Sequence, residues 1–277
     1  MLKQRLLQHR RGDVLAPKID AYLRQGTPNF SEQTITEIAR LAIATPRSRA
    51  RLFSASGLDR CMRQQLLQVL DYPQEEVPNA RLANVFFDGN WRHLRWQALF
   101  LEMGLVARGK MSADGFAESE DGEWMLEVGV TLPSHMLRGT VDSILVLDGE
   151  PWIVDIKGAN PRTFSGVKAD QSPYRAYQMQ MLAYMKATGV PRALLFYEDK
   201  ASQEYHEVRI TLADAQQQEA QFEGRVAALR HYWEQQALPD PLPQAPANPD
   251  CRSCPFQIDC ASATFTTKYI DGGELPL

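Results

Sequence analysis

The sequence predicts an α/β protein whose central mixed sheet is flanked by helices. Two observations carry this prediction. Apolar residues recur at helical spacing over much of the first 103 residues, whereas between residues 123 and 157 they form short, strand-like runs. After residue 157, helix-like and strand-like segments alternate, which is typical of α/β architectures. The composition, with 44% hydrophobic and 23% charged residues, is that of an ordinary globular protein.

The N-terminal part is predicted to be helical, with interruptions at Pro17, Gly26 and Pro28. Further helices are expected over residues 59–70 and 89–103. The apolar positions at helical spacing in the first 50 residues are Leu2, Leu6, Leu7, Ile35, Ile38, Leu41 and Ile43.

The middle of the chain is predicted to form strands. Residues 123–130, 137–147 and 151–157 are short runs rich in Val, Ile, Leu and Trp. The Asp148–Gly149 pair between the last two runs is typical of a tight hairpin turn. The segments predicted after them are a helix over 174–188, strands over 192–198 and 204–210, and an amphipathic helix over 214–235.

A proline-rich stretch follows the last helix. Residues 237–250, ALPDPLPQAPANPD, hold five prolines in fourteen residues, so they are expected to be extended and stiff. The chain is therefore divided into an N-terminal helical region over 1–88, a core over 89–236, and a linker with a cysteine segment over 237–277.

The net charge of −4 excludes a uniformly basic nucleic-acid-binding protein. The charge is uneven, however, because residues 1–63 hold twelve Lys and Arg against five Asp and Glu. A basic front on an acidic body suits local contact with phosphate and cation binding elsewhere. The alternative is that Arg47, Arg49 and Arg51 only solvate a helix end.

Neither a membrane span nor a secretory leader is expected. No apolar run is long enough to cross a bilayer, and the N-terminal residues lack an apolar stretch before a cleavage site. The expectation is a cytoplasmic protein, of a bacterial, archaeal or phage-infected cell, whose cysteines stay reduced.

The segment LRGTVDSILVLDGEPWIVDIKGANP, residues 137–161, combines two predicted strands and a tight turn. Side chains alternate along a strand, so Asp155 and Lys157 are expected on one face and Ile156 on the other. The hairpin can bring Asp142 near Asp155, and two such carboxylates repel unless a cation lies between them. This pattern indicates a Mg²⁺ or Mn²⁺ site. A solvated Asp–Lys pair is the alternative, which the apolar residues around both aspartates disfavour.

Three short motifs follow one another in this part of the chain. They are Gly139-x-x-Asp142, Asp155-Ile156-Lys157 and Gln180-x-x-x-Tyr184. In this order they resemble the RecB-like branch of the PD-(D/E)XK nucleases. The resemblance implies a restriction-endonuclease-like core.

The resemblance also implies the metal ligands. Asp142 and Asp155 would bind the metal together with the backbone carbonyl of Ile156. His93, which precedes the strands, matches the upstream histidine that many members of this branch add as a ligand. The alternative for His93 is an ordinary core or surface histidine.

The remaining motif residues would act in catalysis. Lys157 would support the nucleophilic water or stabilise charge on the phosphate. Gln180 and Tyr184, at i and i+4, share one helix face and would line the lysine and the DNA. Without the resemblance they would be taken as an ordinary amphipathic pair.

The chain has four cysteines, and three of them form the C-x2-C-x5-C pattern of CRSCPFQIDC. Four thiolates suit either a tetrahedral Zn²⁺ or an iron–sulfur cluster, and chemistry alone does not choose between them. Unrelated structural cysteines are a further alternative. The four residues are Cys61, Cys251, Cys254 and Cys260.

One cysteine before a RecB-like core and three after it is similar to the arrangement in the AddB nuclease domain and the CRISPR-associated RecB-like exonucleases. That similarity implies a structural 4Fe–4S cluster that joins the two ends of the chain. It leaves the pathway open between recombination, repair, CRISPR adaptation and a phage-type exonuclease.

The resulting expectation is a metal-dependent DNA exonuclease that hydrolyses phosphodiester bonds at single-stranded or frayed ends. Its partners would be DNA and proteins of recombination or CRISPR adaptation. The alternatives are a non-catalytic DNA-end-binding or assembly subunit, which the intact acids and lysine disfavour, and a nuclease with zinc in place of the cluster.

Overall fold

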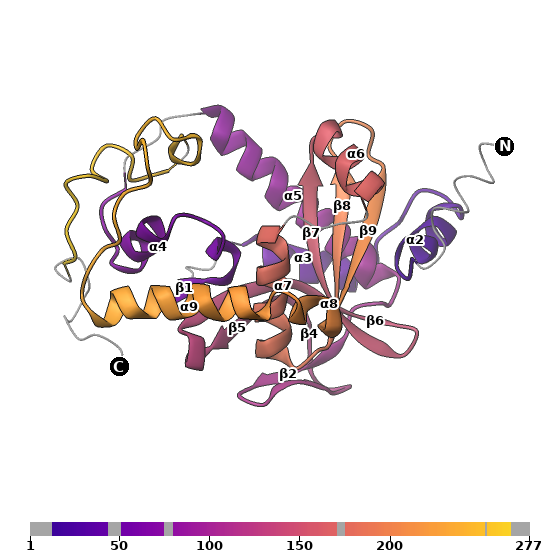
Figure 1. The fold of residues 1–277 in the computed structure, drawn as a ribbon. Helices are drawn as coiled ribbons and strands as arrows, with labels where there is room; N and C mark the ends of the chain where they lie inside the picture. The colour runs from indigo at the N-terminus through magenta and orange to yellow at the C-terminus, as the bar shows by residue number, and fades with distance from the viewer. Residues whose placement is uncertain (1–12, 44–50, 75–79, 171–174, 253, 267–277) are drawn as a thin grey trace.

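The computed structural model describes residues 13–43, 51–74, 80–170, 175–252 and 254–266, and it confirms the predicted α/β architecture (Figure 1). A six-stranded mixed sheet lies at its centre. Its strands are β1 (Phe53–Ser54), β5 (Leu126–Leu132), β6 (Leu137–Leu147), β7 (Glu150–Ala159), β8 (Arg192–Asp199) and β9 (Tyr205–Thr211). The order is β1-β6-β7-β8-β9, and β5 also pairs with β6. The pairs β1–β6 and β7–β8 are parallel, and the other pairs are antiparallel.

Helices cover both faces of this sheet. They are α2 (Ala16–Leu23), α3 (Glu32–Ala42), α4 (Met62–Val69), α5 (Ala80–Glu102), α6 (Pro161–Asp170), α7 (Arg175–Thr188), α8 (Leu212–Gln216) and α9 (Glu219–Glu234). Apolar side chains of α4, α7 and α9 share one core with residues such as Ile153, whereas those of α2 and α5 share another with Val154 and Ile156. Because side chains alternate along β7, a single strand supplies both cores.

A smaller sheet and three short 3₁₀ turns complete the described elements. The sheet has the order β3-β2-β4, with β2 (Arg108–Ser112), β3 (Gly115–Glu118) and β4 (Glu123–Trp124). The turns span Ala55–Gly57, Pro133–His135 and Pro249–Cys251.

The N-terminal helices start where side chains bind their first amides. Glu207 on β9 is buried and accepts the amides of Leu15 at 2.9 Å and Ala16 at 2.8 Å, which caps α2 against the sheet. Ser31 caps α3 by accepting the Thr34 amide, and Glu102 accepts the Ser31 amide at 2.8 Å. Both helices are thereby fixed to the core by polar contacts.

The predicted hairpin is confirmed. Asp148 and Gly149 both have positive φ, at 53° and 82°, as a two-residue turn of type I′ requires. The turn sets the register of β6 against β7, so Leu147 pairs with Glu150 and Ser143 with Val154.

Several predicted boundaries were wrong. The helix predicted to begin at residue 89 begins at Ala80 instead, where an i,i+4 ion pair between Asp88 and Arg92 at 3.0 Å supports the helix across Gly89. The helix predicted over 214–235 is divided into α8 and α9, so α8 contacts β9 while the apolar face of α9 stays on the core. Helix α6 and strands β2 and β3 have no counterpart among the predicted elements.

The N-terminal region also contributes a strand that was not predicted, because Phe53 and Ser54 form β1 of the central sheet. The predicted helical positions Leu2, Leu6 and Leu7 lie outside the described residues, as do Arg47 and Arg49.

Residues 237–250 contain neither α-helix nor strand, as their prolines predict, and lead from α9 to the cysteine segment. Buried Arg63 on α4 binds this part of the chain. Its guanidinium donates to the carbonyl oxygens of Cys260 at 2.9 Å, Pro239 at 2.8 Å and Ala263 at 2.6 Å. Phe256 packs on Leu67 beside these bonds. No helix among the described residues is long and apolar enough to cross a membrane.

We expect Arg63→Met to release the C-terminal segment. The methionine keeps the apolar stem but leaves three carbonyls without this donor, two of them in buried hydrogen bonds, which costs about 3 kcal/mol of unfolding free energy. Limited proteolysis followed by mass spectrometry should find faster cleavage within residues 237–266. Arg60→Met, at an exposed neighbouring position, is the control and should be cut like the wild type. Equal cleavage of both variants would contradict the role of Arg63.

Candidate metal and active site

Asp155 and Lys157 lie on the same face of β7, as strand alternation predicts. Asp155 is only 2% exposed, and its Oδ2 lies 2.6 Å from Lys157 Nζ. The lysine also lies 4.4 Å above the ring of Tyr177 on α7, which adds a cation–π contact. The pair is therefore buried and fixed in place by its neighbours.

Asp142 lies where the β6–β7 pairing ends. The last paired residues are Ser143 and Val154, and beyond them the Asp142 Oδ2 accepts the amide of Ile156 at 2.6 Å. A residue in a strand directs its amide and its carbonyl toward the same edge. The Ile156 carbonyl therefore faces the Asp142 side of β7, where no ladder partner from β6 continues.

Helix α7 contributes Gln180 and Tyr184 from the face that packs on this part of the sheet. The amide nitrogen of buried Gln180 donates to Asp155 Oδ1 and to the Tyr184 hydroxyl, both at 3.0 Å, while Lys157 Nζ lies 3.4 Å from Gln180 Oε1. Gly139 makes room for Tyr184, because a Cβ at residue 139 would lie 2.4 Å from the ring. The glycine of the first motif is thus explained by packing.

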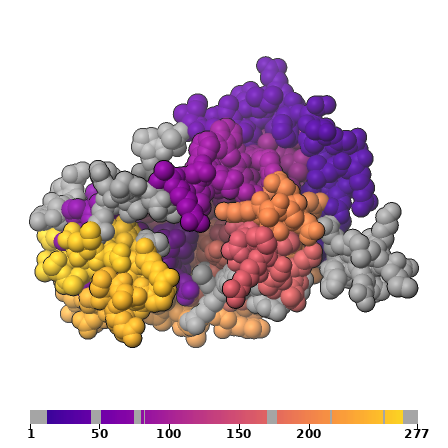
Figure 2. Space-filling model, turned by 90° about the horizontal axis from the view of Figure 1, so that it is seen from above, coloured from indigo at the N-terminus to yellow at the C-terminus, as the bar shows by residue number. Residues whose placement is uncertain are grey.

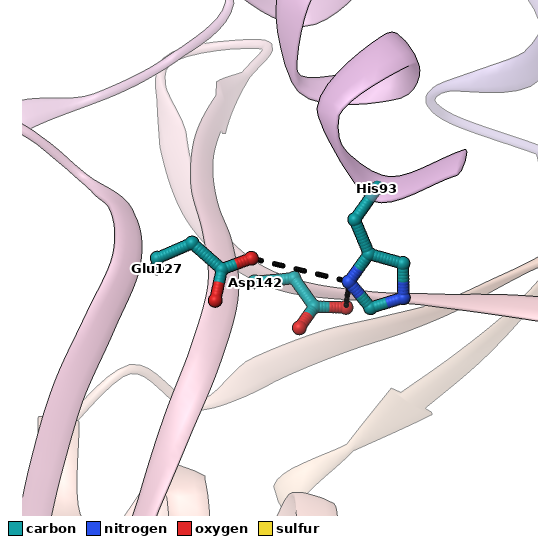
Figure 3. Close-up of side chains that lie close together, drawn as sticks. All are labelled: His93, Glu127 and Asp142. Carbon is teal, nitrogen blue, oxygen red and sulfur yellow. Dashed lines mark ion pairs between the residues drawn. The ribbon is translucent and has the colours of Figure 1, made fainter. Parts of the chain in front are cut away.

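His93 reaches the site from α5, on the other face of the sheet (Figure 3). Its Nδ1 lies 3.6 Å from Asp142 Oδ2 and 3.9 Å from Glu127 Oε1. The ligand atoms of these three residues all lie within 4.8 Å of one another, a spacing at which one cation can bind all three. In Figure 3 the three side chains converge from α5, β5 and β6.

Glu127 occupies its position through an unusual backbone conformation and one fixed hydrogen bond. Its φ is +48°, in the left-handed region, which costs a residue with a side chain about 1–3 kcal/mol. The amide nitrogen of fully buried Gln97 donates at 2.9 Å to both Glu127 Oε1 and the Asp142 carbonyl oxygen. Gln97, one turn after His93 on α5, thus joins β5 to β6 at the site.

The charged groups at the site shift one another's pKa. Burial, followed by the negative charge of Asp155, raises the pKa of Asp142 to about 7. Burial acts to lower the pKa of Lys157, but Asp155 and Asp142 outweigh it and raise that pKa above its ordinary value. For His93, burial also acts to lower the pKa, and Glu127 with Asp142 raises it on balance. The cluster therefore favours positive charge, whether from protons or from a cation.

This donor set fits a hard divalent cation. Three carboxylates, one imidazole and one backbone carbonyl are mostly oxygen ligands, which Mg²⁺ and Mn²⁺ prefer. Burial of carboxylates this close together without a cation is costly, which is a further reason why the residues present suit such an ion.

A family model described as the PD-(D/E)XK nuclease superfamily matches residues 48–261, more than half of the chain. The chain belongs to this superfamily. It is therefore a nuclease, a member of the hydrolases.

Solved structures similar to this PD-(D/E)XK nuclease were also found. LHK-Exo in complex with dAMP has 20% identity and a TM-score of 0.47, over 68% of this chain and 90% of the other. The alkaline exonuclease LHK-Exo from Laribacter hongkongensis has 19% identity and a TM-score of 0.45, with the same coverage. SSO0001 has 14% identity and a TM-score of 0.40, over 83% and 94% of the two chains. A comparison with curated protein sequences gave no match.

The structure brings the predicted nuclease residues together. Those that meet around the end of the β6–β7 pairing are His93, Asp142, Asp155, Ile156, Lys157, Gln180 and Tyr184. Glu127 and Gln97 also contribute to the site, but neither was among the residues predicted from the sequence. The signal that indicates Asp142 was also present for Glu127, an acidic residue between Leu126 and Val128. For Gln97 the only signal was a glutamine one turn after His93, between apolar neighbours.

The four cysteines lie in one region of this nuclease, between the start of α4 and the C-terminal segment. Cys61 directly precedes α4, whose Arg63 binds the Cys260 carbonyl. Burial raises the pKa of the Cys251 thiol, and the nearby Cys260 and Cys61 raise it further. The pKa of Cys254 is raised by burial and by the same neighbours. Residues far apart in the sequence therefore place their thiols within electrostatic reach of one another.

We expect Gly139→Ala to disturb the site from its edge. The added Cβ would overlap the Tyr184 ring, and overpacking of this kind costs about 1–3 kcal/mol. Differential scanning calorimetry should find a lower Tm. Gly129→Ala on neighbouring β5 is the matched control, because a Cβ there meets nothing within 4 Å. A drop in Tm of the same size in both variants would show that contact with Tyr184 is not the reason for Gly139.

Proposed function

We propose that this protein is a divalent-metal-dependent DNA exonuclease that acts at single-stranded or frayed ends. One observation supports this most strongly. Asp142, Asp155 and Lys157, from two strands whose pairing stops beside them, converge with His93 from one face of the sheet and Gln180 from the other. That constellation is suited to hydrolysis of a phosphodiester bond. The exonuclease activity and the preference for ends follow from the RecB-like order of motifs.

The metal would be held by Asp142, Asp155, His93 and the Ile156 carbonyl. Glu127 is a further candidate ligand because it lies beside His93. When bound, Mg²⁺ or Mn²⁺ supplies charge for the phosphate oxygens and lowers the pKa of a ligand water. Gln97 would keep Glu127 directed at the site through its hydrogen bond.

Lys157 would orient the attacking water and stabilise the developing charge on the phosphate. Its ammonium is held by Asp155 Oδ2, which keeps it charged and fixed beside the acid. Gln180 binds the other oxygen of the same carboxylate and touches Tyr184, so it would fix both acid and lysine in the reacting geometry.

Variants at the acid and the lysine test this function. We expect Asp155→Asn and Lys157→Ala to lower Mn²⁺-dependent degradation of end-labelled single-stranded DNA at least ~100-fold. The first variant loses a carboxylate that would hold the metal, and the second loses the positive charge that would stabilise the transition state. Product ladders on denaturing gels give the rates, and a closed circular single strand should stay intact if cutting needs an end.

The matched controls are Asp148→Asn in the hairpin turn and Lys110→Ala on β2, both exposed and outside the motifs. Both should keep wild-type rates. Equal degradation by wild type, Asp155→Asn and Lys157→Ala would reject the catalytic assignment. A wild type that binds DNA ends without cutting them would favour a DNA-end-binding subunit.

We also propose a 4Fe–4S cluster on Cys61, Cys251, Cys254 and Cys260. Four thiols suit such a cluster, and Cys61, Cys251 and Cys260 lie near enough to one another to affect the same thiol pKa. Iron rather than zinc is favoured by the order of one cysteine before the core and three after it, which is similar to the AddB nuclease domain and the CRISPR-associated RecB-like exonucleases. The cluster would close the two ends of the chain, in a cytoplasmic protein of recombination, repair or CRISPR adaptation.

Optical spectroscopy and metal analysis of anaerobically purified protein test the cluster. We expect broad absorbance near ~400 nm from iron–thiolate bonds, lost in Cys254→Ser. Ser262→Ala, an exposed position in the same segment, is the control and should keep the absorbance. A colourless preparation with one zinc per chain would reject the cluster in favour of a zinc site.

A further inference from the structure

The first half of α5 carries large apolar side chains that remain in contact with solvent. Val85 is 43% exposed, Phe86 63%, Phe87 60% and Trp91 53%. Two phenylalanines and a tryptophan exposed over two helical turns form an apolar surface of the kind that usually binds something. Figure 2 shows this start of α5 in purple beside a hollow between the yellow C-terminal segment and α6.

Helical geometry separates these aromatics into two stripes. Phe86 lies seven residues before His93, so the two side chains share one face, about 10 Å apart along the axis at 1.5 Å per residue. Between them on that face lie Asn90 and Gly89, and a Cβ on Gly89 would meet no atom within 4 Å. Phe87 and Trp91 lie on a different stripe, where their rings meet edge to face at 6.1 Å. Of these aromatic residues, Phe86 therefore shares the helix face of His93, and the space at Gly89 between them is open.

The charge around Phe86 does not oppose a polyanion. The nearest carboxylate on the helix, Asp88, is neutralised by Arg92 at 3.0 Å and lies 3.9 Å from Lys200 Nζ. These contacts lower the pKa of Asp88, the Arg92 hydrogen bond most of all. Glycine and asparagine carry no charge on the path itself. A phosphodiester chain can leave the metal ligands along this face without meeting an unpaired acid there.

We propose that Phe86 is a stacking platform for an unpaired base of the DNA strand whose phosphate lies at the metal ligands. This inference rests on the proposed nuclease function and adds a substrate-positioning residue to it. An aromatic side chain offers a flat surface to the face of a base, and a single strand exposes that face. A duplex presents mainly base edges, because its bases stack on one another. The platform thus selects single-stranded ends.

The test compares Phe86→Ala with Phe87→Ala, an exposed phenylalanine one residue along the same helix but on the other stripe. Binding of a labelled single-stranded oligodeoxynucleotide is measured by anisotropy with Ca²⁺ in place of Mn²⁺. Phe86→Ala should weaken binding about 5- to 150-fold, Phe87→Ala should match the wild type, and Phe86→Trp should restore affinity. A 2-aminopurine near the strand end should be quenched by the wild type and by Phe87→Ala but not by Phe86→Ala.

The outcomes separate the two proposals. If the wild type degrades DNA with Mn²⁺ while Phe86→Ala binds and quenches like the wild type, the stacking platform is rejected and the nuclease stands. If the wild type degrades no DNA, the proposed function is rejected, and the stacking platform is rejected as well because it rests on that function. A change confined to oligomeric state in Phe86→Ala, measured by sedimentation, would assign the residue to a protein interface and overturn the proposal.

Discussion

The hydrogen bond from the Ile156 amide to the Asp142 carboxylate is the contact on which the rest of the site depends. It takes the place of a ladder bond just beyond the last β6–β7 pair, so the two strands separate without leaving a buried amide unpaired. The separation opens the edge of β7 that carries the Ile156 carbonyl. It also brings a second carboxylate next to Asp155, and the pKa of Asp142 rises because this group is buried and because Asp155 is negatively charged. A cation is the natural complement of that arrangement.

Side chains from two helices on opposite faces of the sheet converge at this point. From one face, α7 places Gln180 against Asp155, and from the other, α5 places His93 and Gln97 against Asp142 and β5. Buried Glu198 on β8 fixes α5 by an ion pair with Arg92 at 2.6 Å. The contacts of Arg92 thus anchor α5 next to His93. Buried charged side chains thus position α5 against the sheet, and their burial is costly unless each charge is paired.

Much of the fold followed from local patterns. Alternating apolar runs and an Asp–Gly turn determine the β6–β7 hairpin, because positive φ at both turn positions suits few other residue pairs. The start of α5 could not be predicted from Gly89, since glycine and aspartate normally favour a boundary and only the Asp88–Arg92 pair shows why the helix continues. The division between α8 and α9 was equally hidden, because no glycine or proline marks the turn at Gln217 and Gln218.

The sequence by itself determined the chemistry of this protein: two acids and a lysine in a hairpin, a glutamine and a tyrosine one helical turn apart, and four cysteines at the two ends of the chain. Spacing within a strand or helix fixes which face a residue takes, so those relations are local. The tertiary structure decided what is not local. It placed Glu127 of β5 next to His93 of α5. It also packed the Tyr184 ring where a side chain at residue 139 would lie, so that only glycine fits there. Finally, it brought Arg63 to the Cys260 carbonyl and its neighbours. Such contacts depend on how elements pack against one another, which no single stretch of sequence encodes.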